Sequence, residues 1–482
     1  MEKRNWRIVY SSYEGMEKKA VELLYKEMGA LTLRNSGVYT IYVLPCVQEK
    51  VAALDQNAVV VGLYHESAII QKYIQEDEIA ADGYVVKVMN NPENEELKLV
   101  LITAKEPCAL FYGAVDFVDD YFPIAAPRHG ALKLVHEIFE GNFPDYYNAS
   151  APAVKTRCVF TWGHPINDYR DYIENMARLK LNQLIIWNDY APLNAKDIIS
   201  YAHEFGIQVI WGYAWGWQRH CAGIDLNEMN LELLAEKILN TYEEQYADLG
   251  GDGIYFQSFT ELNADKFGDK LVAEVVTDFV NDVAGRLLEK HPNLLLQFGL
   301  HATSVKDHLP FIAKVDPRVE IMWEDCGTFP YGYHPIIEDE EKYRQTMAFT
   351  DEILTLREEG RVSMLFKGFM TLDWHGDRFA HQAGPYVMGL SSPQLVKQDI
   401  ELLKPIWRQL QSGWLQYGRY AYEMAKHIYE HGNKETALGL AGQFAGGIWL
   451  PEALCAQILW ECDRPYEEIF NKVTRRKSIE IV

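Results

Sequence analysis

Two groups of carboxylates directly follow apolar runs of the chain and could act as a catalytic pair. Glu261 comes shortly after the run DGIYFQS (252–258), and Glu324 and Asp325 come directly after VEIMW (319–323). Cleavage of a glycosidic bond needs such a pair, because one carboxylic acid protonates the leaving oxygen while the other carboxylate attacks the sugar or activates water. We therefore predict Glu261 as the general acid and Asp325 or Glu324 as its partner. The alternative for each is a solvated or helix-capping carboxylate.

Aromatic and polar residues occupy the same kind of position, after the ends of apolar runs. Trp and Tyr rings can stack on sugars, whereas the polar side chains can hydrogen-bond sugar hydroxyls or pair with a sugar carboxylate. The predicted substrate-binding residues are His164, Trp187, Asn188, Asp189, Trp211, Tyr213, Trp215, Gln257, His301, Trp323, Lys367, Asp373 and Trp374. Two alternatives stay open: the cluster WGYAWGW (211–217) could equally be core packing, and each histidine alone could be structural.

Patterns typical of other chemistries are absent from the sequence. There is no GxSxG elbow for acyl transfer and no HxH or HExxH pair for a metal. No Gly-rich phosphate loop lies between an apolar run and a helical segment. We therefore expect neither a metal nor a cofactor.

The residues singled out above lie at the ends of strands in a regular strand–helix alternation. Helical spacing of apolar residues recurs between the apolar runs, at 168–180, 195–205, 231–249, 270–290 and 340–359. Strands buried on both faces and followed by helices indicate a parallel sheet, and their number favours a (β/α)8 barrel, whose active site lies at the carboxyl ends of the strands. The predicted strands are RCVFTW (157–162), QLIIWND (183–189), IQVIWGY (207–213), DGIYFQS (252–258), LLLQFGL (294–300), VEIMWED (319–325) and VSMLFKGF (362–369), with PYVMGLSS (385–392) as the eighth.

The predicted fold class is therefore α/β, a TIM-type barrel with two flanking regions. Residues 1–125 contain short β-rich runs and two helical segments (15–28 and 107–121), which predict a small α/β domain. The expected order is this domain, a linker at 126–154, the barrel at 155–392 and a C-terminal helical region at 393–482.

Composition limits the partners of the protein. A net charge of −23 argues against nucleic acid and against an anionic membrane. Seven scattered cysteines without a CxxC pair suggest reduced thiols, which predicts a cytoplasmic protein. The aromatic C-terminal helices could form the face of a homodimer.

Two stretches resemble the α-glucuronidases and the β-N-acetylhexosaminidase-like glycoside hydrolases. ALFYGAVDF (109–117) is similar to the helix that ends the N-terminal domain in both groups, and 172–215 is similar to a helix–strand–helix–strand segment of the α-glucuronidases. The resemblance implies a hexosaminidase domain-2-like N-terminal domain followed by a catalytic barrel. It also implies that Glu261 is the general acid, since Thr260-Glu261 stands where the α-glucuronidases have Ser-Glu. The hexosaminidases have Asp-Glu there.

The sequence as a whole predicts a glycoside hydrolase that is exo-acting on oligosaccharides. One alternative is a β-N-acetylhexosaminidase-type hydrolase. Another is a non-catalytic carbohydrate-binding protein on the same barrel, and a third is a metal-dependent lyase or isomerase.

Overall fold

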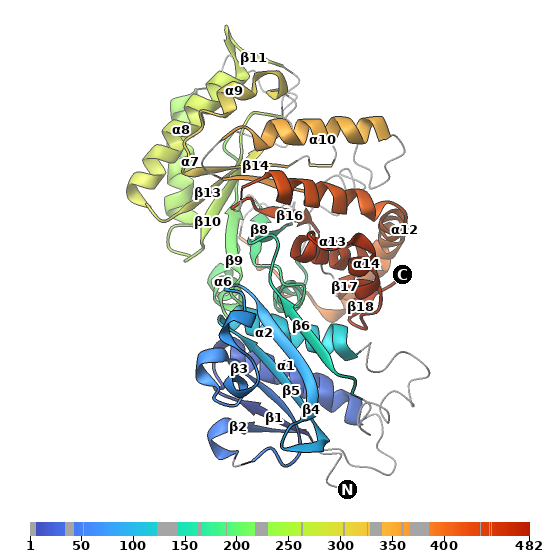
Figure 1. Cartoon of the computed structure of the whole chain (residues 1–482). Helices are drawn as coiled ribbons and strands as arrows, with labels where there is room; N and C mark the ends of the chain where they lie inside the picture. The colour runs from blue at the N-terminus through green and yellow to red at the C-terminus, as the bar shows by residue number, and fades with distance from the viewer. Residues whose placement is uncertain are drawn as a thin grey trace. The chain divides into compact units, whose positions relative to one another are not determined.

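The computed structural model contains two compact units, which are considered separately below (Figure 1). One unit comprises Met1–Pro152 with Phe470–Ile479, and the other comprises Ala153–Ile469 with Glu480–Val482. The structure describes residues 6–33, 43–51, 53–122, 143–161, 166–188, 190–216, 230–261, 264–301, 304–324, 326–327, 340–357, 361–366, 385–433, 435–442, 444 and 446–482.

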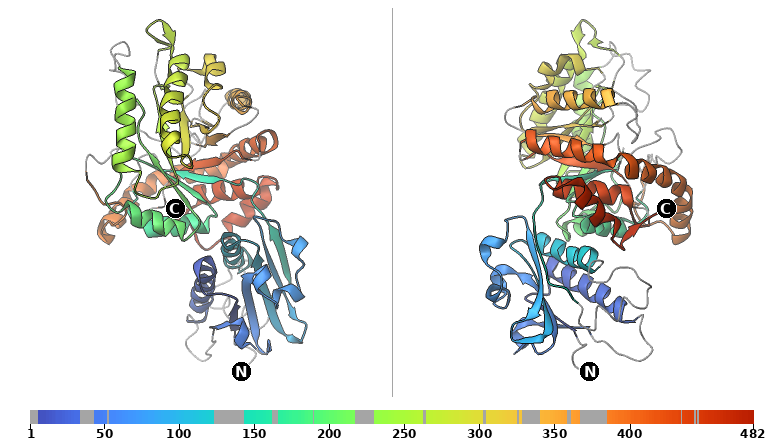
Figure 2. Two further views of the ribbon diagram at one scale, coloured as in Figure 1. Left: turned by 90° about the vertical axis from the view of Figure 1, so that its left-hand side faces the viewer. Right: turned by 45° about the vertical axis from the view of Figure 1, so that its right-hand side comes forward.

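The N-terminal unit is built on one mixed sheet, with the strand order β2-β1-β3-β5-β4-β6. The first four of these strands run parallel, and β4 is antiparallel to both of its neighbours. Helices α1 (Gly15–Leu33) and α2 (Pro107–Asp116) lie against one face, as Figure 2 shows. The strands are β1 (Trp6–Tyr10), β2 (Val43–Val47), β3 (Asn57–Leu63), β4 (Tyr84–Asn91), β5 (Asn94–Ala104) and β6 (Tyr146–Ser150).

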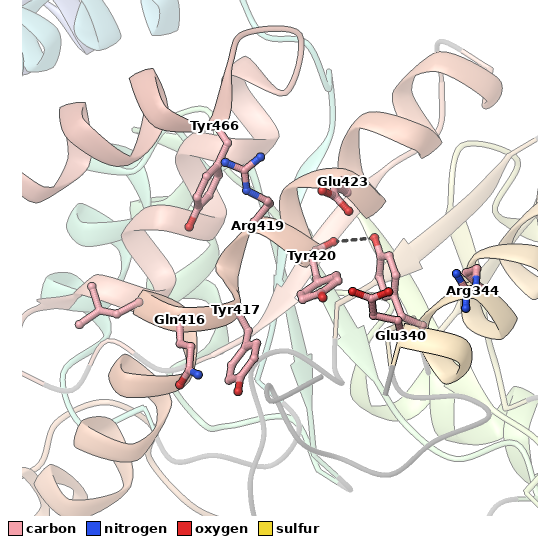
Figure 3. A pocket seen from close by; sticks show the side chains of 10 residues that line it. Glu340, Arg344, Gln416, Tyr417, Arg419, Tyr420, Glu423 and Tyr466 are labelled. Atoms are coloured by element: carbon pink, nitrogen blue, oxygen red, sulfur yellow. Dashed lines mark hydrogen bonds between the residues drawn. The ribbon is translucent and has the colours of Figure 1, made fainter. Parts of the chain in front are cut away.

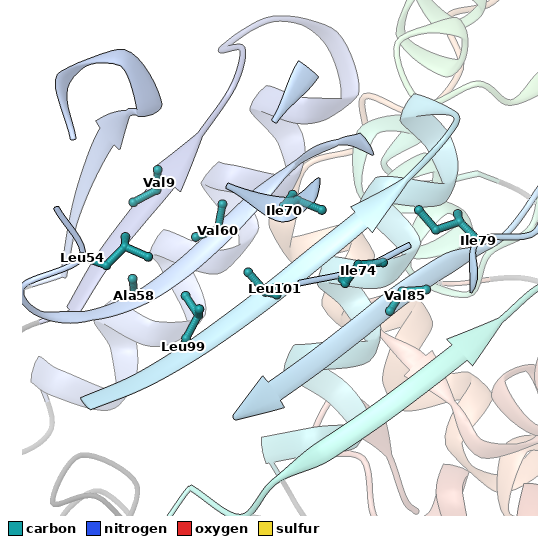
Figure 4. Packing of buried hydrophobic residues seen from close by; sticks show 10 residues of the cluster. All are labelled: Val9, Leu54, Ala58, Val60, Ile70, Ile74, Ile79, Val85, Leu99 and Leu101. Carbon is teal, nitrogen blue, oxygen red and sulfur yellow. The ribbon is translucent and has the colours of Figure 1, made fainter. Parts of the chain in front are cut away.

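A separate apolar layer covers the other face of this sheet. Every second residue of a strand points to the same face, so Ala58 and Val60 of β3 lie beside Leu99 and Leu101 of β5 (Figure 4). Short one-turn helices after β3 place Ile70, among others, on these side chains. Burial on both faces explains why the strand sequences are almost continuously apolar.

The segment predicted to be a linker contributes the edge strand β6 (Tyr146–Ser150), which pairs with β4. The apolar pattern did not indicate it, because an edge strand is half exposed and this one carries Asn148 and two tyrosines. Asn148 donates a hydrogen bond to the buried carboxylate of Asp116 at 2.5 Å.

The second unit is a closed barrel of eight parallel strands. Seven strands lie where they are predicted. They are β7 (Arg157–Phe160), β8 (Gln183–Trp187), β9 (Gln208–Gly212), β10 (Gly253–Gln257), β13 (Leu295–Leu300), β14 (Val319–Trp323) and β15 (Val362–Leu365).

All five helices predicted between the barrel strands are present. They are α5 (Tyr169–Arg178), α6 (Ala195–His203), α7 (Leu231–Gln245), α8 (Val272–Lys290) and α10 (Glu340–Leu354), with the short helix α9 (Leu309–Ile312) before β14. The N-cap of α5 shows how the sequence begins a helix, since the carboxylate of Asp168 accepts hydrogen bonds from the backbone N–H groups of Arg170 and Asp171.

The predicted eighth strand is wrong. The barrel is closed by β16 (Leu438–Ala441), which pairs with β15 and β7. Its sequence, LGLA, contains a glycine because the neighbouring strand leaves no room for a side chain there. A Cβ on Gly439 would overlap Sγ of Cys158. Residues 385–392 instead hydrogen-bond to the loop before α6, where the Asn194 side chain binds both the N–H and the carbonyl of Met388.

The C-terminal region is helical only in part. Residues 434–450 were predicted to be helical, yet they contain β16 and the short strand β17 (Ile448–Trp449). The long helix α12 (Pro393–His431) runs beside α10 (Figures 1 and 2), and α13 (Leu450–Glu461) packs on α12. Among the described residues, no helix has the length and apolar character needed to cross a membrane.

Candidate active site

Glu324 lies inside the barrel at the carboxyl end of β14. Met322 of the same strand belongs to the apolar cluster of the barrel interior, and strand alternation places Glu324, two residues later, on the same inward face. The side chain of Glu324 has no exposed area, and its backbone N–H donates to the carbonyl of Leu300 at 3.2 Å. Of the two candidates that the sequence leaves open, Glu324 therefore faces the interior, whereas Asp325 lies outside the described residues.

Three side chains converge on the carboxylate of Glu324, and two of them donate hydrogen bonds to it. Nε2 of Gln257 lies 2.6 Å and 2.8 Å from its two oxygens, and the hydroxyl of Tyr255 donates to Oε1. Nε2 of His301 lies 2.8 Å from Oε2. Such convergence is what a buried carboxylate requires, since an ionised carboxylate only accepts hydrogen bonds and is costly to bury without them.

Gly299 makes this arrangement possible. It lies on β13 directly beside Met322 of β14, between Tyr255 and Glu324. A Cβ at this position would overlap both the Tyr255 hydroxyl and Oε1 of Glu324. Only glycine therefore leaves room for the two side chains to meet.

Glu261 follows β10 and lies on the other side of His301. Its side chain is 42% exposed, and its Oε2 lies 3.7 Å from the same Nε2 that contacts Glu324. Because both carboxylates contact the same imidazole nitrogen, their Oε2 atoms can be no further apart than the sum of these two distances. One accessible and one enclosed carboxylate therefore share a single imidazole.

Thr260 anchors the turn that carries Glu261. Its carbonyl accepts a hydrogen bond from the backbone N–H of Ser304 at 3.2 Å, and its Oγ1 accepts one from the N–H of His301 at 3.3 Å. Thr260 has no exposed area. The residue before the predicted acid is therefore part of the scaffold, which ties the end of β10 to the end of β13.

Of the predicted aromatics that the structure describes, Trp187 faces the interior. It lies at the end of β8, 4% exposed, with its ring edge-on to Tyr255 at a centroid distance of 5.9 Å. The next residue, Asn188, donates to the hydroxyl of Tyr386 at 2.8 Å. The hydroxyl of Tyr386 donates in turn to the carbonyl of Tyr190 at 3.1 Å.

Four other predicted aromatics pack outside the barrel interior. Trp215 stacks on Phe256 with a centroid distance of 3.6 Å, and Trp211 and Tyr213 both lie against Tyr246. Trp323 packs its edge against Phe349 of α10 and has no exposed area. Of the two alternatives for WGYAWGW, the structure shows core packing for the rings that it describes, Trp211, Tyr213 and Trp215, since all three are buried. Their predicted role, and that of Trp323, as sugar-stacking surfaces is therefore wrong.

The remaining predicted site residues lie outside the described residues. They are His164, Asp189, Asp325, Lys367, Asp373 and Trp374. Among the residues that the structure does describe, no group of three or more His, Cys, Asp or Glu side chains is arranged to hold a metal ion.

Sequence reasoning missed Tyr255, Gly299 and Tyr386 as members of this region. Tyr255 has the same strand parity as Gln257, which was predicted, so period-two alternation along β10 could have revealed it. Gly299 carries no such signal in a single sequence, because its role depends on the neighbouring strands.

Comparisons with known proteins identify the fold of the chain. No protein-family model and no curated protein sequence matches it. Among solved structures, it is similar to a GH138 enzyme targeting pectin rhamnogalacturonan II, with a TM-score of 0.52 and 12% identity over 96% of this chain. It also matches a family GH115 4-O-methyl-α-glucuronidase with specificity for decorated arabinogalactans, with a TM-score of 0.46 and 12% identity over 96% of this chain. The chain spans 65% of the length of the first protein and 57% of the second. At this identity, the likeness to the GH138 enzyme shows a shared fold.

Proposed function

We propose that the protein is a glycoside hydrolase that uses Glu261 as general acid and Glu324 as the second carboxylate. The observation that carries this proposal is the contact of both carboxylates with Nε2 of His301 at the carboxyl end of the barrel, 3.7 Å and 2.8 Å away. Barrel enzymes perform their chemistry at this end. The shared fold with a GH138 enzyme supports the same reading.

The surroundings of the two carboxylates suit different roles. Glu261 is partly exposed and can reach the glycosidic oxygen of a bound sugar, to which it would give a proton. Glu324 accepts hydrogen bonds from Tyr255 and Gln257 and lies 2.8 Å from Nε2 of His301, so its oxygens are held in position. It would attack the anomeric carbon or remove a proton from the attacking water. His301 lies between them and would hold the two carboxylates in a fixed relative position.

The finer parts of the proposal concern the substrate. We take the enzyme to act on the ends of oligosaccharides, and Trp187 to form one wall of the site, since this predicted aromatic faces the interior. The β-N-acetylhexosaminidase alternative lacks support at Thr260, because this buried threonine is bound to the β13 end and is not an Asp that could orient an acetamido group.

Turnover on a panel of aryl glycosides, uronides, N-acetyl sugars and natural oligosaccharides tests the proposal. Wild type should cleave at least one class, and Glu261→Gln should lose about 100-fold or more on the oligosaccharide of that class. Glu320→Gln is a matched control, because Glu320 is a buried inward carboxylate at the opposite end of β14 and should not affect turnover. Binding without hydrolysis by wild type on every substrate would favour the non-catalytic alternative.

A further inference from the structure

A pocket lies on the outside of the barrel unit, between α10 and α12 (Figure 3). Its volume is about 660 Å³. It is lined by four tyrosines, two arginines, two glutamates, one glutamine and one leucine: Glu340, Tyr343, Arg344, Leu415, Gln416, Tyr417, Arg419, Tyr420, Glu423 and Tyr466. We propose that this pocket is an accessory binding groove for neutral oligosaccharides, distinct from the site around Glu324.

The tyrosines form a supported aromatic wall. Tyr420 packs edge-on against Tyr343 at a centroid distance of 4.7 Å, and the hydroxyl of the buried Tyr343 donates to the carbonyl of Tyr420 at 3.0 Å. Tyr417 projects from the neighbouring turn of α12 into the pocket (Figure 3). Rings held in place in this way offer apolar faces for sugar C–H groups and lose little conformational freedom when a ligand binds.

The polar groups of the groove suit hydroxyls rather than anions. Both arginines are engaged, Arg344 with Glu341 at 3.1 Å and Arg419 with Glu467. The carboxylates that line the pocket are Glu340 and Glu423. A carboxylate accepts hydrogen bonds from adjacent sugar hydroxyls and repels a uronate, so a neutral sugar chain fits this groove better than an acidic one.

One further observation disfavours a cationic ligand. The guanidinium of Arg419 already lies over the ring of Tyr466, 5.5 Å from its centroid, and places positive charge beside the aromatic wall.

The topology places one end of the groove on the same face of the barrel as Glu324. Glu340 is the first residue of α10, the helix that follows β14, and helices of this fold begin on the face where the strands end. An oligosaccharide in the groove could therefore extend towards the proposed active site. Only this last relation rests on the proposed function.

Affinity electrophoresis of the full chain tests the groove, with Glu261→Gln added to prevent turnover. Native gels would contain galactan, arabinan, xylan, glucomannan or polygalacturonate. We expect at least one neutral polysaccharide to retard the protein and Tyr417→Ala to weaken that binding threefold or more. Tyr429→Ala is the matched control, because Tyr429 is an exposed tyrosine of α12 outside the pocket and should leave binding unchanged.

Three results would overturn the groove: no retardation by any neutral polysaccharide, equal retardation of the Tyr417→Ala protein, or stronger retardation by polygalacturonate. Hydrolysis of small aryl glycosides by the otherwise wild-type chain provides the separate readout. Tyr417→Ala should leave that activity unchanged. Retardation of the protein by a neutral polysaccharide, with no hydrolysis of any substrate, would contradict the proposed function but would still support the accessory groove.

Discussion

At the scale of single residues, the central feature is how one buried carboxylate is held. Glu324 has no exposed area and is surrounded by the hydroxyl of Tyr255, the amide of Gln257 and the imidazole of His301. Removing a donor from a buried charge costs more than an ordinary hydrogen bond contributes, because the charge keeps its desolvation penalty. Loss of a donor also weakens the electrostatic stabilisation that fixed hydrogen bonds give to the charge that develops in a transition state.

Tyr255→Phe should reduce kcat/KM by about 10-fold to 100-fold, because it deletes one donor to Glu324 without changing the packing of the ring. Steady-state kinetics on the substrate identified in the panel would measure this. Tyr213→Phe is the control, since this buried tyrosine donates to the carbonyl of Ile238 outside the barrel interior. It should cost roughly 1 kcal/mol of stability and no activity. Equal activity of the two variants would remove Tyr255 from the mechanism.

Gly299→Ala should destabilise the barrel by roughly 1–3 kcal/mol, because the added methyl group overlaps the Tyr255 hydroxyl and the Glu324 carboxylate. Denaturant unfolding followed by circular dichroism would detect it. Gly285→Ala serves as the control, since a Cβ there meets nothing within 4 Å and lies in α8. That change should be neutral or stabilise by up to about 1 kcal/mol. A Gly299→Ala protein as stable as wild type would show that the interior can rearrange.

At the scale of elements, the C-terminal segment is bound to the N-terminal sheet unit by buried charges. The guanidinium of Arg476 contacts the carboxylate of Asp120 at 2.6 Å and 3.0 Å, and Lys472 lies 3.2 Å from the same group. Asp120 and Arg476 are 6% and 5% exposed. A buried pair of this kind is costly to break from one side.

Arg476→Met should therefore destabilise the N-terminal unit by roughly 3–5 kcal/mol, since it leaves Asp120 buried with less compensation. Differential scanning calorimetry would show the transition of this unit moving to lower temperature. Arg419→Met, which removes an exposed pair with Glu467, should cost about 0–1 kcal/mol. Similar losses in both variants would mean that burial does not decide the strength of the Asp120 pair.

Helix α13 carries a buried acid that makes stability depend on pH. Burial raises the pKa of Glu452 from an ordinary value of 4.5 to about 8. The folded protein then holds the proton more tightly than the unfolded chain, so this contribution is full below pH 4.5 and is lost as the pH rises towards 8. Glu452→Gln should remove up to roughly 3–5 kcal/mol of that pH dependence. Parallel pH slopes of wild type and variant between pH 5 and 8 would contradict the assignment.

At the scale of the whole molecule, the barrel strands that could be predicted from the sequence are those whose burial on both faces produces a long apolar run. Seven barrel strands were predictable because each forms an apolar run between helices. The eighth, β16, is four residues of Leu, Gly and Ala, in which Gly439 leaves room for Cys158 and Leu365 on the two neighbouring strands. No local propensity marks such a strand.

The candidate site was predictable in its position but not in its orientation. The ends of β10, β13 and β14 do bring Glu261, His301 and Glu324 together, as the strand order requires. Whether Glu324 or Trp323 points inward depends on strand parity, which is set by neighbours such as Met322 and Tyr255. An apolar run buried on both faces carries no sign of which face is the interior, so Trp211, Tyr213 and Trp215 could not be assigned to the core from the sequence.

The central claim is that Glu261 and Glu324 have different roles, and the leaving-group dependence of their variants tests it most directly. Cleavage rates would be compared for Glu261→Ala and Glu324→Ala on aryl glycosides of graded leaving-group acidity and on the natural oligosaccharide. The account predicts that Glu261→Ala keeps activity on the most acidic leaving groups and loses it on the oligosaccharide, because only a poor leaving group needs the proton. Glu324→Ala should lose activity on all of them. A Glu324→Ala enzyme that cleaves the oligosaccharide at the wild-type rate would contradict the account.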